Sequence, residues 1–517
     1  MTLLLDPSLK HTLKKDKQLL EKTKLPIVTV SATYVEDLKG YHQFPEIDST
    51  QDVVFSRAHY SMALAVAVEA WQTNIDPKKA WIVDPTNYIN LKDRSSVYFT
   101  EMIGKILART PLLKMLKDFA DRFARNKLPI LASITPPLLE LTKNVSQPIL
   151  SLHIASGNIL AAKGKQVVQM VTDPHVREDY LNEAERKNMT FLVFDNNTKL
   201  EFMEKARLLN KKIDQSKVIV TGPPIDPRIV HSAQNKQIWQ DGPLKLCITT
   251  GGLGTNKNEI KQLLQKLLPE LHKNPSPYQL LVYAGTHQDI YQMVIELAKS
   301  HEIELNKIVA NDPANFSAYG DLLQLSNNQK SSLSIKNEKL SVIYHPQIVD
   351  ANELLIHLGF PWADGFISKP SGDMAYDAIA SGSFLLTLKE WGEWEHNIRK
   401  IFTKLDVAKV ANTNNIIKQL ESLKSKDNQK SSWIEQAMKS ALNINALFTQ
   451  GANNIIKTVE EIKKNKTSQK KLNYLSFLAI LCSVCLLHFG QNFIMGKVPS
   501  PSFCFLSTSL FLLYSVT

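Results

Sequence analysis

The chain alternates apolar runs with helix-like stretches over most of its length, and this alternation constrains the fold more than any other feature. It is typical of parallel strands that are joined by crossover helices and buried on both faces. In the first half, helices are expected at 61–71 and 97–124. The strands expected there are 26–32, 52–56, 80–85, 128–133, 167–173 and 190–195.

A proline-rich stretch at 217–229 interrupts the pattern and predicts a strand followed by an interdomain linker. A second cycle begins at 244–271 with a strand, a glycine-rich loop and an amphipathic helix. The polar stretch 326–339 is expected to be a surface insertion. Further strands are expected at 278–286, 340–348, 363–369 and 383–389. The pattern predicts an α/β fold with two Rossmann-like, doubly wound domains.

Length and composition agree with this organisation. A chain of 517 residues is too long for one ordinary core, and 44% hydrophobic residues suffice to bury two and exclude wholesale disorder. The expected segments are a basic N-terminal segment (1–24), an N-terminal acceptor domain (25–225), a linker (226–243), a C-terminal donor domain (244–405), closing helices (406–464), and a basic flank with an apolar hairpin (465–517).

The net charge of +11 favours an anionic partner, that is, a nucleotide, an acidic lipid surface or nucleic acid. Nucleic acid is the least favoured, because the positive charge is concentrated in the tails and no aromatic-basic face is visible. The cysteines fall in apolar stretches without a disulfide framework, which fits a reducing compartment. They are Cys247, Cys482, Cys485 and Cys504.

The two ends of the chain predict a cytoplasmic protein with a C-terminal membrane anchor. Residues 1–24 are rich in lysine and lack the long apolar core of a signal peptide. Residues 472–495 are apolar and long enough to span a bilayer, and the five lysines of 463–471 keep the preceding chain cytoplasmic. The stretch 503–516 either returns through the membrane or lies within it. The alternative for 472–495 is a buried helix of the soluble fold.

Two strand-to-helix turns in the second domain are candidate ligand sites, because doubly wound domains bind ligands beyond the carboxyl ends of their strands. The turn TTGGLGTN (249–256) brings glycines to the start of a helix, where backbone N–H groups are able to bind phosphate. The stretch FISKPSGDMAYDAIASGS (366–383) has the same form, with Ser371 and Gly372 at the junction. Either turn alone is equally a structural turn, but two together favour the two phosphates of a nucleoside diphosphate.

These motifs, with VIYHPQI (342–348) and WGEWEHN (391–397), resemble the donor-binding domain of GT-B glycosyltransferases. The nearest branch contains the galactosyl- and glucosyldiacylglycerol synthases, such as monogalactosyldiacylglycerol synthase, and the enzyme that adds N-acetylglucosamine to peptidoglycan lipid I. The family pattern of Ser/Thr-Lys-Pro/Ala-Gly-Gly/Pro and then Glu-Ala becomes Ser368-Lys369-Pro370-Ser371-Gly372 and then Asp377-Ala378. The Gly-Gln-Glu of the family becomes Gly392-Glu393-Trp394. The resemblance covers about residues 25–405 and implies two domains that face a cleft.

The resemblance also implies a UDP-sugar site. Groups around both turns hold the diphosphate, Asp377 binds the ribose, and the segment containing His345 contacts uracil. Glu393 and Asn397 face the sugar, and Lys369 stabilises the leaving UDP. The implied donor-binding residues are Gly251, Gly252, Gly254, Thr255, His345, Lys369, Ser371, Gly372, Asp373, Asp377, Glu393 and Asn397. Simpler readings are a surface Asp377, a solvated Lys369, and a His345 that only caps its turn.

The candidates for a catalytic base, which accepts the proton of the acceptor hydroxyl, are His59, Asp173 and His175, all at expected strand ends. In relatives a histidine follows a glycine-rich loop, and His59 takes that place here. Ser56-Arg57-Ala58 replace the glycines, and the charge of Arg57 is a substitute for the lost amides. We favour His59 as the base, with Asp173 orienting it or the acceptor; a structural role for either is the alternative.

The sequence thus predicts a membrane-anchored hexosyltransferase with its catalytic domains in the cytoplasm. It transfers a sugar from a UDP-sugar to a lipid, of the diacylglycerol or polyprenyl-linked type, with inversion. No cofactor or metal is expected, because no Asp-x-Asp motif occurs. The rival predictions are a sugar-nucleotide epimerase, which shares the two-domain fold, and a catalytically silent nucleotide-binding scaffold at the membrane.

Overall fold

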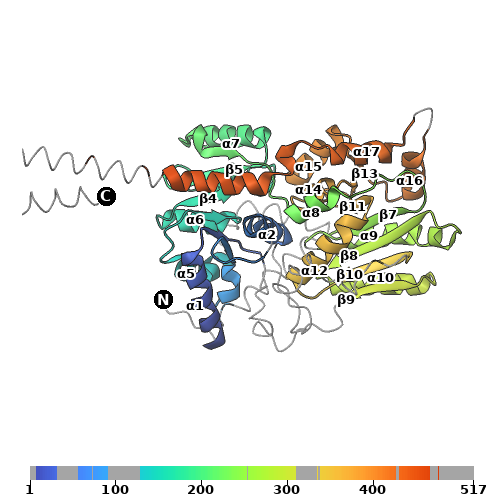
Figure 1. Cartoon of the computed structure of the whole chain (residues 1–517), viewed down its shortest axis with the longest axis horizontal. Coiled ribbons are helices and arrows are strands. Elements are labelled where there is room, and N and C mark those ends of the chain that lie inside the picture. The colour runs from blue at the N-terminus through green and yellow to red at the C-terminus, as the bar shows by residue number, and fades with distance from the viewer. Residues whose placement is uncertain are drawn as a thin grey trace, which may run out of the picture. The chain divides into compact units, whose positions relative to one another are not determined.

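The structure is a computed structural model of the 517-residue chain (Figure 1). It describes residues 7–31, 56–72, 74–90, 93, 129–252, 254–309, 335, 338–426, 430–465, 468 and 476. The elements described below belong to the compact unit Met1–Val459.

The first sheet is parallel throughout its described strands, in the order β2-β1-β3-β4-β5-β6. Its strands are β1 (Leu25–Val28), β2 (Ala80–Val83), β3 (Ile149–Ser151), β4 (Val167–Met170), β5 (Met189–Val193) and β6 (Val218–Val220). Its helices are α1 (Pro7–Lys22), α2 (Arg57–Trp71), α5 (Pro129–Thr142), α6 (Ile154–Ala162) and α7 (Asn196–Leu208). The strand residues are almost all buried, as expected when helices cover both faces of a sheet.

The second sheet is also parallel, in the order β13-β12-β11-β7-β8-β10-β9. Its strands are β7 (Leu244–Thr249), β8 (Tyr278–Gly285), β9 (Leu305–Val309), β10 (Leu340–Tyr344), β11 (Gly365–Ser368), β12 (Phe384–Thr387) and β13 (Ala408–Val410). Its helices are α9 (Lys257–Leu267), α10 (Gln288–Ser300), α12 (Ile348–Leu354), α13 (Phe360–Trp362), α14 (Met374–Ala380), α15 (Glu393–Lys404), α16 (Ile416–Lys424) and α17 (Trp433–Leu442), and a π-helical turn (Leu355–Gly359) joins α12 to α13.

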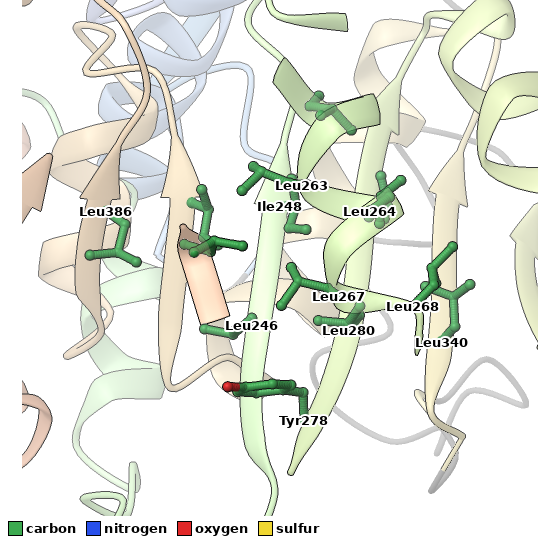
Figure 2. Packing of buried hydrophobic residues seen from close by; sticks show 14 of the residues in the cluster. Leu246, Ile248, Leu263, Leu264, Leu267, Leu268, Tyr278, Leu280, Leu340 and Leu386 are labelled. Atoms are coloured by element: carbon green, nitrogen blue, oxygen red, sulfur yellow. The ribbon is translucent and has the colours of Figure 1, made fainter. Parts of the chain in front are cut away.

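Helix α9 shows how the second core forms. Its leucines recur at helical spacing, and Leu263, Leu264 and Leu267 are fully buried against Leu246 and Ile248 of β7 (Figure 2). The opposite face of α9 carries lysines and glutamines that remain in water. Between the two sheets, the expected linker contains the short helix α8 (Pro227–Ala233), which Asp226 caps.

The two parallel sheets confirm the α/β prediction and are consistent with a GT-B arrangement. The expected strand at 128–133 is wrong, because these residues begin helix α5. The apolar run continues to Thr142, and a short apolar run alone does not distinguish a strand from a buried helix. Strands β3, β9 and β13 were missed; β3 and β13 have only three residues each, and β9 has two polar residues between its apolar ones.

Several predictions fall outside the described residues. These are the strand at 52–55, the helix at 97–124, most of the insertion at 326–339, and the apolar stretches 472–495 and 503–516. In the described part of the chain, no helix has both the length and the apolar character needed to cross a bilayer.

The end of the unit returns to the first sheet. Asn454, in the helical residues 451–459, donates from Nδ2 to the carbonyl oxygen of Thr221, which follows β6, at 3.0 Å. The backbones are so close that a Cβ at Gly451 would lie 1.9 Å from the carbonyl oxygen of Pro223. Gly222 has φ +88°, and a Cβ there would lie 1.9 Å from the carbonyl oxygen of Leu447. Two glycines therefore permit this contact.

Gly451→Ala is expected to destabilise the protein, although alanine normally favours a helix over glycine. The added methyl meets backbone, which does not move as a flexible side chain would, so we expect a loss of about 1–3 kcal/mol in the free energy of unfolding. Urea unfolding measures it. The control Lys457→Ala, at an exposed position of the same helix, should stay within about 0.5 kcal/mol. A neutral Gly451→Ala would show that this contact is loose.

Candidate functional site

The order of strands in the first sheet reverses beside β1. The chain passes from β1 to β2 on one side and then to β3 on the other, and ligands of doubly wound sheets bind where the order reverses. The helices that follow β1 and β3 begin at this point. His59 of α2 meets His153, the N-cap of α6, with ring centroids 5.0 Å apart and the rings at 85°. The predicted base thus lies at the reversal point of its sheet.

The second sheet reverses its order beside β7, which lies between β8 and β11. The glycine-rich turn follows β7, and the Ser371–Gly372 elbow follows β11. They lie side by side, because Thr249 donates to Ser368 Oγ at 2.6 Å and Lys369 Nζ donates to Thr255 Oγ1 at 3.3 Å. The two candidate turns are therefore neighbours, as two phosphate-binding turns have to be.

Two residues that sequence reasoning missed hold the glycine-rich turn in place. Asn256 donates from Nδ2 to the carbonyl oxygen of Thr249 and accepts from the N–H of Gly251, both at 3.1 Å. Nε2 of the buried His287 lies 3.1 Å from the carbonyl oxygen of Gly252. The turn then enters the left-handed region at Gly254, with φ +62°. Asn256, directly before α9, was visible as a helix-capping residue type, whereas nothing local indicated His287.

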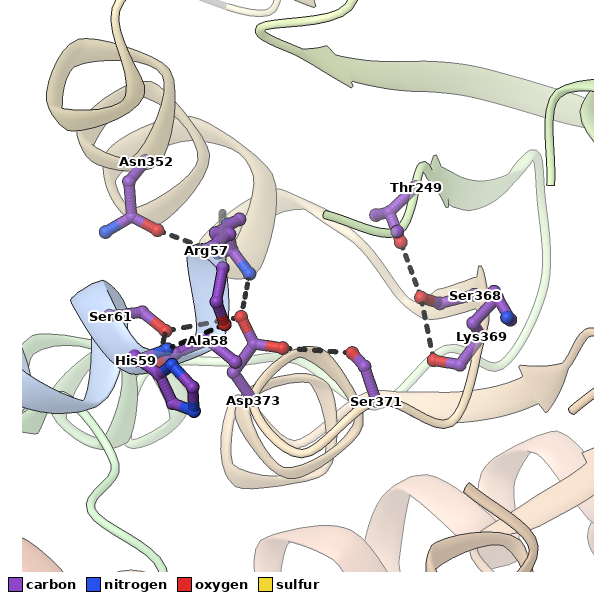
Figure 3. A network of polar contacts seen from close by, with 12 residues as sticks. Arg57, Ala58, His59, Ser61, Thr249, Asn352, Ser368, Lys369, Ser371 and Asp373 are labelled. Atoms are coloured by element: carbon purple, nitrogen blue, oxygen red, sulfur yellow. Dashed lines mark hydrogen bonds and ion pairs between the residues drawn. The ribbon is translucent and has the colours of Figure 1, made fainter. Parts of the chain in front are cut away.

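The two reversal points meet at Arg57 (Figure 3). This residue opens α2, but its guanidinium forms a buried ion pair with Asp373 beside α14 and donates to Asn352 Oδ1 of α12 at 2.7 Å. Ser61 and Ser371 also donate to the Asp373 carboxylate, at 3.2 and 2.9 Å. Side chains from both sheets therefore form one polar network.

Backbone contacts bring the same loops together. A Cβ at Gly372 would lie 2.6 Å from Oδ1 of Asp173, so only glycine fits between the elbow and the loop after β4. A Cβ at Gly252 would lie 3.6 Å from the backbone nitrogen of Arg57. Asn397 of α15 donates to the carbonyl oxygen of Pro174 at 3.0 Å. Asp173 thus lies against the elbow.

Arg57 is charged in this setting. Burial opposes the charge, but the Asp373 carboxylate and the neighbouring Tyr283 raise the pKa of Arg57 above its ordinary value. The guanidinium carbon also lies 5.7 Å from the centroid of the Tyr283 ring, within the range of a cation–π contact. A fixed positive charge therefore stands between the two turns.

His59 is a neutral imidazole at pH 7. Burial and the positive charge of Arg177 lower its pKa to about 4. Nε2 of His59 lies 3.3 Å from Thr172 Oγ1, in the loop after β4. A neutral imidazole is the form that accepts a proton, so its protonation state suits a base.

His175, another predicted candidate for the base, lies among carboxylates. His175 is paired with carboxylates, since Nδ1 lies 3.0 Å from Oε1 of Glu201 in α7 and Nε2 lies 3.8 Å from Oε2 of Glu393. The Glu393 side chain is 84% exposed. His175 and Glu393 are therefore brought together, at the edge of the network.

Asp377 lies one helical turn beyond Asp373 on α14, so the two residues share a face. Its side chain is buried, and the carboxyl forms no hydrogen bond with any described residue. Burial and the Asp373 charge raise the pKa of Asp377 well above its ordinary value. The reading of Asp377 as a surface acid is therefore wrong. A buried carboxyl without a protein partner is costly and fits a group that meets a ligand.

Lys369 is buried rather than solvated. Its Nζ lies 3.2 Å from Oε2 of Glu395, and 5.8 Å from the ring centroid of Trp391. Burial raises the pKa of Glu395. The buried acid at the start of α15 is thus Glu395, which sequence reasoning missed in favour of Glu393. The only available signal was its position on the apolar face of α15.

His345 is fully buried, and its Nδ1 accepts from the N–H of Gln347 at 3.1 Å. The predicted turn cap is thus present, and a contact with uracil stays a prediction. In the described residues, no group of three or more His, Cys, Asp or Glu side chains is arranged to hold a metal ion.

Comparison with known proteins leaves the family open. No family model matches the chain, and no curated protein matches it. Similar solved structures include UDP-GlcNAc 2-epimerase of Neisseria meningitidis bound to UDP-GlcNAc (13% identity, 84% of this chain and 100% of that one, TM-score 0.45), MurG of Acinetobacter baumannii (11%, 84% and 99%, 0.42) and UGT71G1 of Medicago truncatula complexed with UDP-glucose (10%, 86% and 99%, 0.42). At such identities and TM-scores, these likenesses carry no conclusion about activity.

The low pKa of His59 predicts a loss of stability in acid. The unfolded chain binds a proton near pH 6.5 and the folded chain only near pH 4, so stability falls as the pH drops through this window. One such group contributes a slope of up to about 1.4 kcal/mol per pH unit. His59→Asn is expected to remove that part of the slope, measured by urea unfolding between pH 7 and 4. The exposed control His11→Asn should keep the wild-type slope. Equal slopes in wild type and His59→Asn would contradict a buried neutral His59.

Proposed function

We propose that this chain is a UDP-sugar-dependent glycosyltransferase that transfers a hexose to a lipid acceptor. One observation carries the proposal: the reversal points of two parallel sheets meet in one polar network. That network contains a fixed guanidinium, and the glycine-rich turn and the neutral imidazole of His59 lie beside it. A buried carboxyl without a hydrogen-bond partner among the described residues lies beside it. This combination suits a nucleotide that has an anionic diphosphate in the middle and a reacting sugar at one end.

In the proposed complex the second sheet binds the donor. The backbone N–H groups of Gly252 and Thr255 and the start of α9, which is eleven residues long, face the diphosphate, while the N–H groups of Thr250, Gly251 and Gly254 hold the turn itself. Lys369 and Arg57 supply positive charge. The carboxyl of Asp377, whose pKa is raised by burial and by the Asp373 charge, accepts a hydrogen bond from a ribose hydroxyl in either protonation state. Helix α14 has only seven residues, so the side chains around the elbow contribute more than the helix field.

The first sheet supplies the base. As the acceptor oxygen attacks the anomeric carbon, the new C–O bond forms and the bond to the diphosphate oxygen breaks. The proton of the acceptor hydroxyl passes to the His59 imidazole, and the electron pair of the broken bond remains on UDP, where Arg57 and Lys369 stabilise the charge. A base with a pKa of about 4 is weak, so stabilisation of the leaving group carries much of the catalysis.

The lipid acceptor and the membrane location are proposed from the sequence. The apolar residues 472–495 and the lysine-rich flank 463–471 suit an enzyme whose donor is soluble while its acceptor lies in a bilayer. We further propose a cytoplasmic active site and chemistry without a metal, as the absence of an Asp-x-Asp motif indicates. Inversion at the anomeric carbon follows the family resemblance.

The experiment supplies full-length protein in lipid vesicles with a panel of labelled UDP-sugars and follows label into the organic phase. We expect donor-dependent labelling of lipid, and a loss of about two to four powers of ten in rate for His59→Ala. The control His11→Ala, at an exposed position of α1, should be as active as the wild type.

Other outcomes separate the rivals. Interconversion of UDP-sugars without lipid labelling would identify an epimerase. Binding of UDP with no turnover would favour a silent scaffold at the membrane. An absence of UDP binding would overturn the proposed site.

A further inference from the structure

Arg57 is held by residues of the opposite sheet. It belongs to the first sheet's α2, yet Asp373, Asn352 and Tyr283 all come from the second sheet. Its side chain is 6% exposed, as is that of Asp373. Both terminal nitrogens of the buried guanidinium are bonded, although its Nε has no hydrogen-bond partner among the described residues, so the charge is pre-organised rather than mobile.

This position lies between the two turns that we assign to the donor diphosphate. Gly252 of the first turn packs against the backbone of Arg57, and Asp373 ends the second. A diphosphate that bridges the turns therefore meets the guanidinium. The diphosphate then lies next to the carboxylate of Asp373.

The hydrogen bonds of Asp373 are those of a bound anion. The carboxylate accepts from the Arg57 guanidinium and from the hydroxyls of Ser61 and Ser371, which lie on different sheets. Guanidinium and hydroxyl groups are also common hydrogen-bond donors to phosphate, and an Arg–phosphate pair is frequently bidentate. The same donors therefore suit either anion.

We propose that Asp373 is an internal counter-ion that holds the place of the donor diphosphate, and that Arg57 exchanges Asp373 for the diphosphate when the donor binds. This inference rests on the proposed function. It makes Arg57 a donor-recognition residue that takes over from the glycine-rich loop of similar enzymes. It also makes Asp373 a residue that lowers affinity for the donor, because the diphosphate has to break an ion pair and approach a like charge.

The alternative is a bridge that only joins the two sheets. With such a bridge, replacing Arg57 and replacing Asp373 should change UDP affinity in the same direction, since breaking a buried pair from either side leaves an uncompensated charge. Exchange of Asp373 for the diphosphate predicts that the two substitutions change UDP affinity in opposite directions. The sign of the change in affinity therefore separates the two readings.

The test measures the binding of UDP and of uridine to the full-length chain by calorimetry. For Asp373→Asn we expect UDP to bind about tenfold more tightly, and for Arg57→Gln about tenfold more weakly, with uridine affinity unchanged in both. The control is Glu353→Gln, which breaks the buried pair between Glu353 and Arg228, 2.6 Å apart, on α12 and α8. It should lose stability and keep the wild-type ratio of UDP to uridine affinity.

Thermal unfolding checks that each variant folds. If Asp373→Asn does not fold, Asp373→Ser removes the same carboxylate, keeps a hydroxyl acceptor beside Arg57, and is expected to tighten UDP binding several-fold. Weaker UDP binding in both Asp373→Asn and Arg57→Gln, or a parallel change in uridine binding, would overturn the inference and leave the proposed function standing. A wild-type protein that binds no UDP would overturn both.

Discussion

The buried ion pair between Arg57 and Asp373 is the contact on which the site depends. It joins helix α2 to the elbow after β11, and so links the two sheets at their reversal points. Removing a guanidinium and a carboxylate from water is expensive, and the attraction between them offsets this cost only when their remaining hydrogen bonds are also satisfied. Asn352, Ser61 and Ser371 provide these bonds except at the Nε of Arg57, which has no partner in the described part of the chain. The network thus fixes the relation of the two turns to α2.

The rest of the site follows from strand direction. In a parallel sheet every carboxyl end lies at one edge, so residues distant in sequence gather there without any local signal. His59, Thr172 and His153 meet in this way in the first sheet. Close packing at Gly372 then brings the edge of one sheet against the other, because a larger residue would strike Asp173. The strand order thus brings the site residues together, and Gly372 permits the close contact with the loop after β4.

Much of the fold could be predicted from the sequence, because buried parallel strands are apolar runs whose signal is local. The exceptions were 128–133, which is apolar whether in a strand or a buried helix, and the missed strands β3, β9 and β13, of which β3 and β13 have only three residues. At the site, the two turns were visible through their glycines. The buried partners were not, since the pairing of Arg57 with Asp373 spans 316 positions and no local pattern records it. Glu395 was missed for a related reason, because burial decides between neighbouring acids and depends on tertiary packing.

The return of the chain to Thr221 has a mechanical consequence. The backbone passes from the first sheet to the second through the linker after β6, and it comes back before residue 446 to contact the same loop at residues 221–223. The second sheet is thus attached by two neighbouring crossings rather than one. Two backbone segments that cross side by side form a hinge with a preferred axis. A single linker would instead allow one sheet to rotate freely relative to the other. Any opening between the sheets is then a rotation about that axis, and it separates the residues farthest from it most.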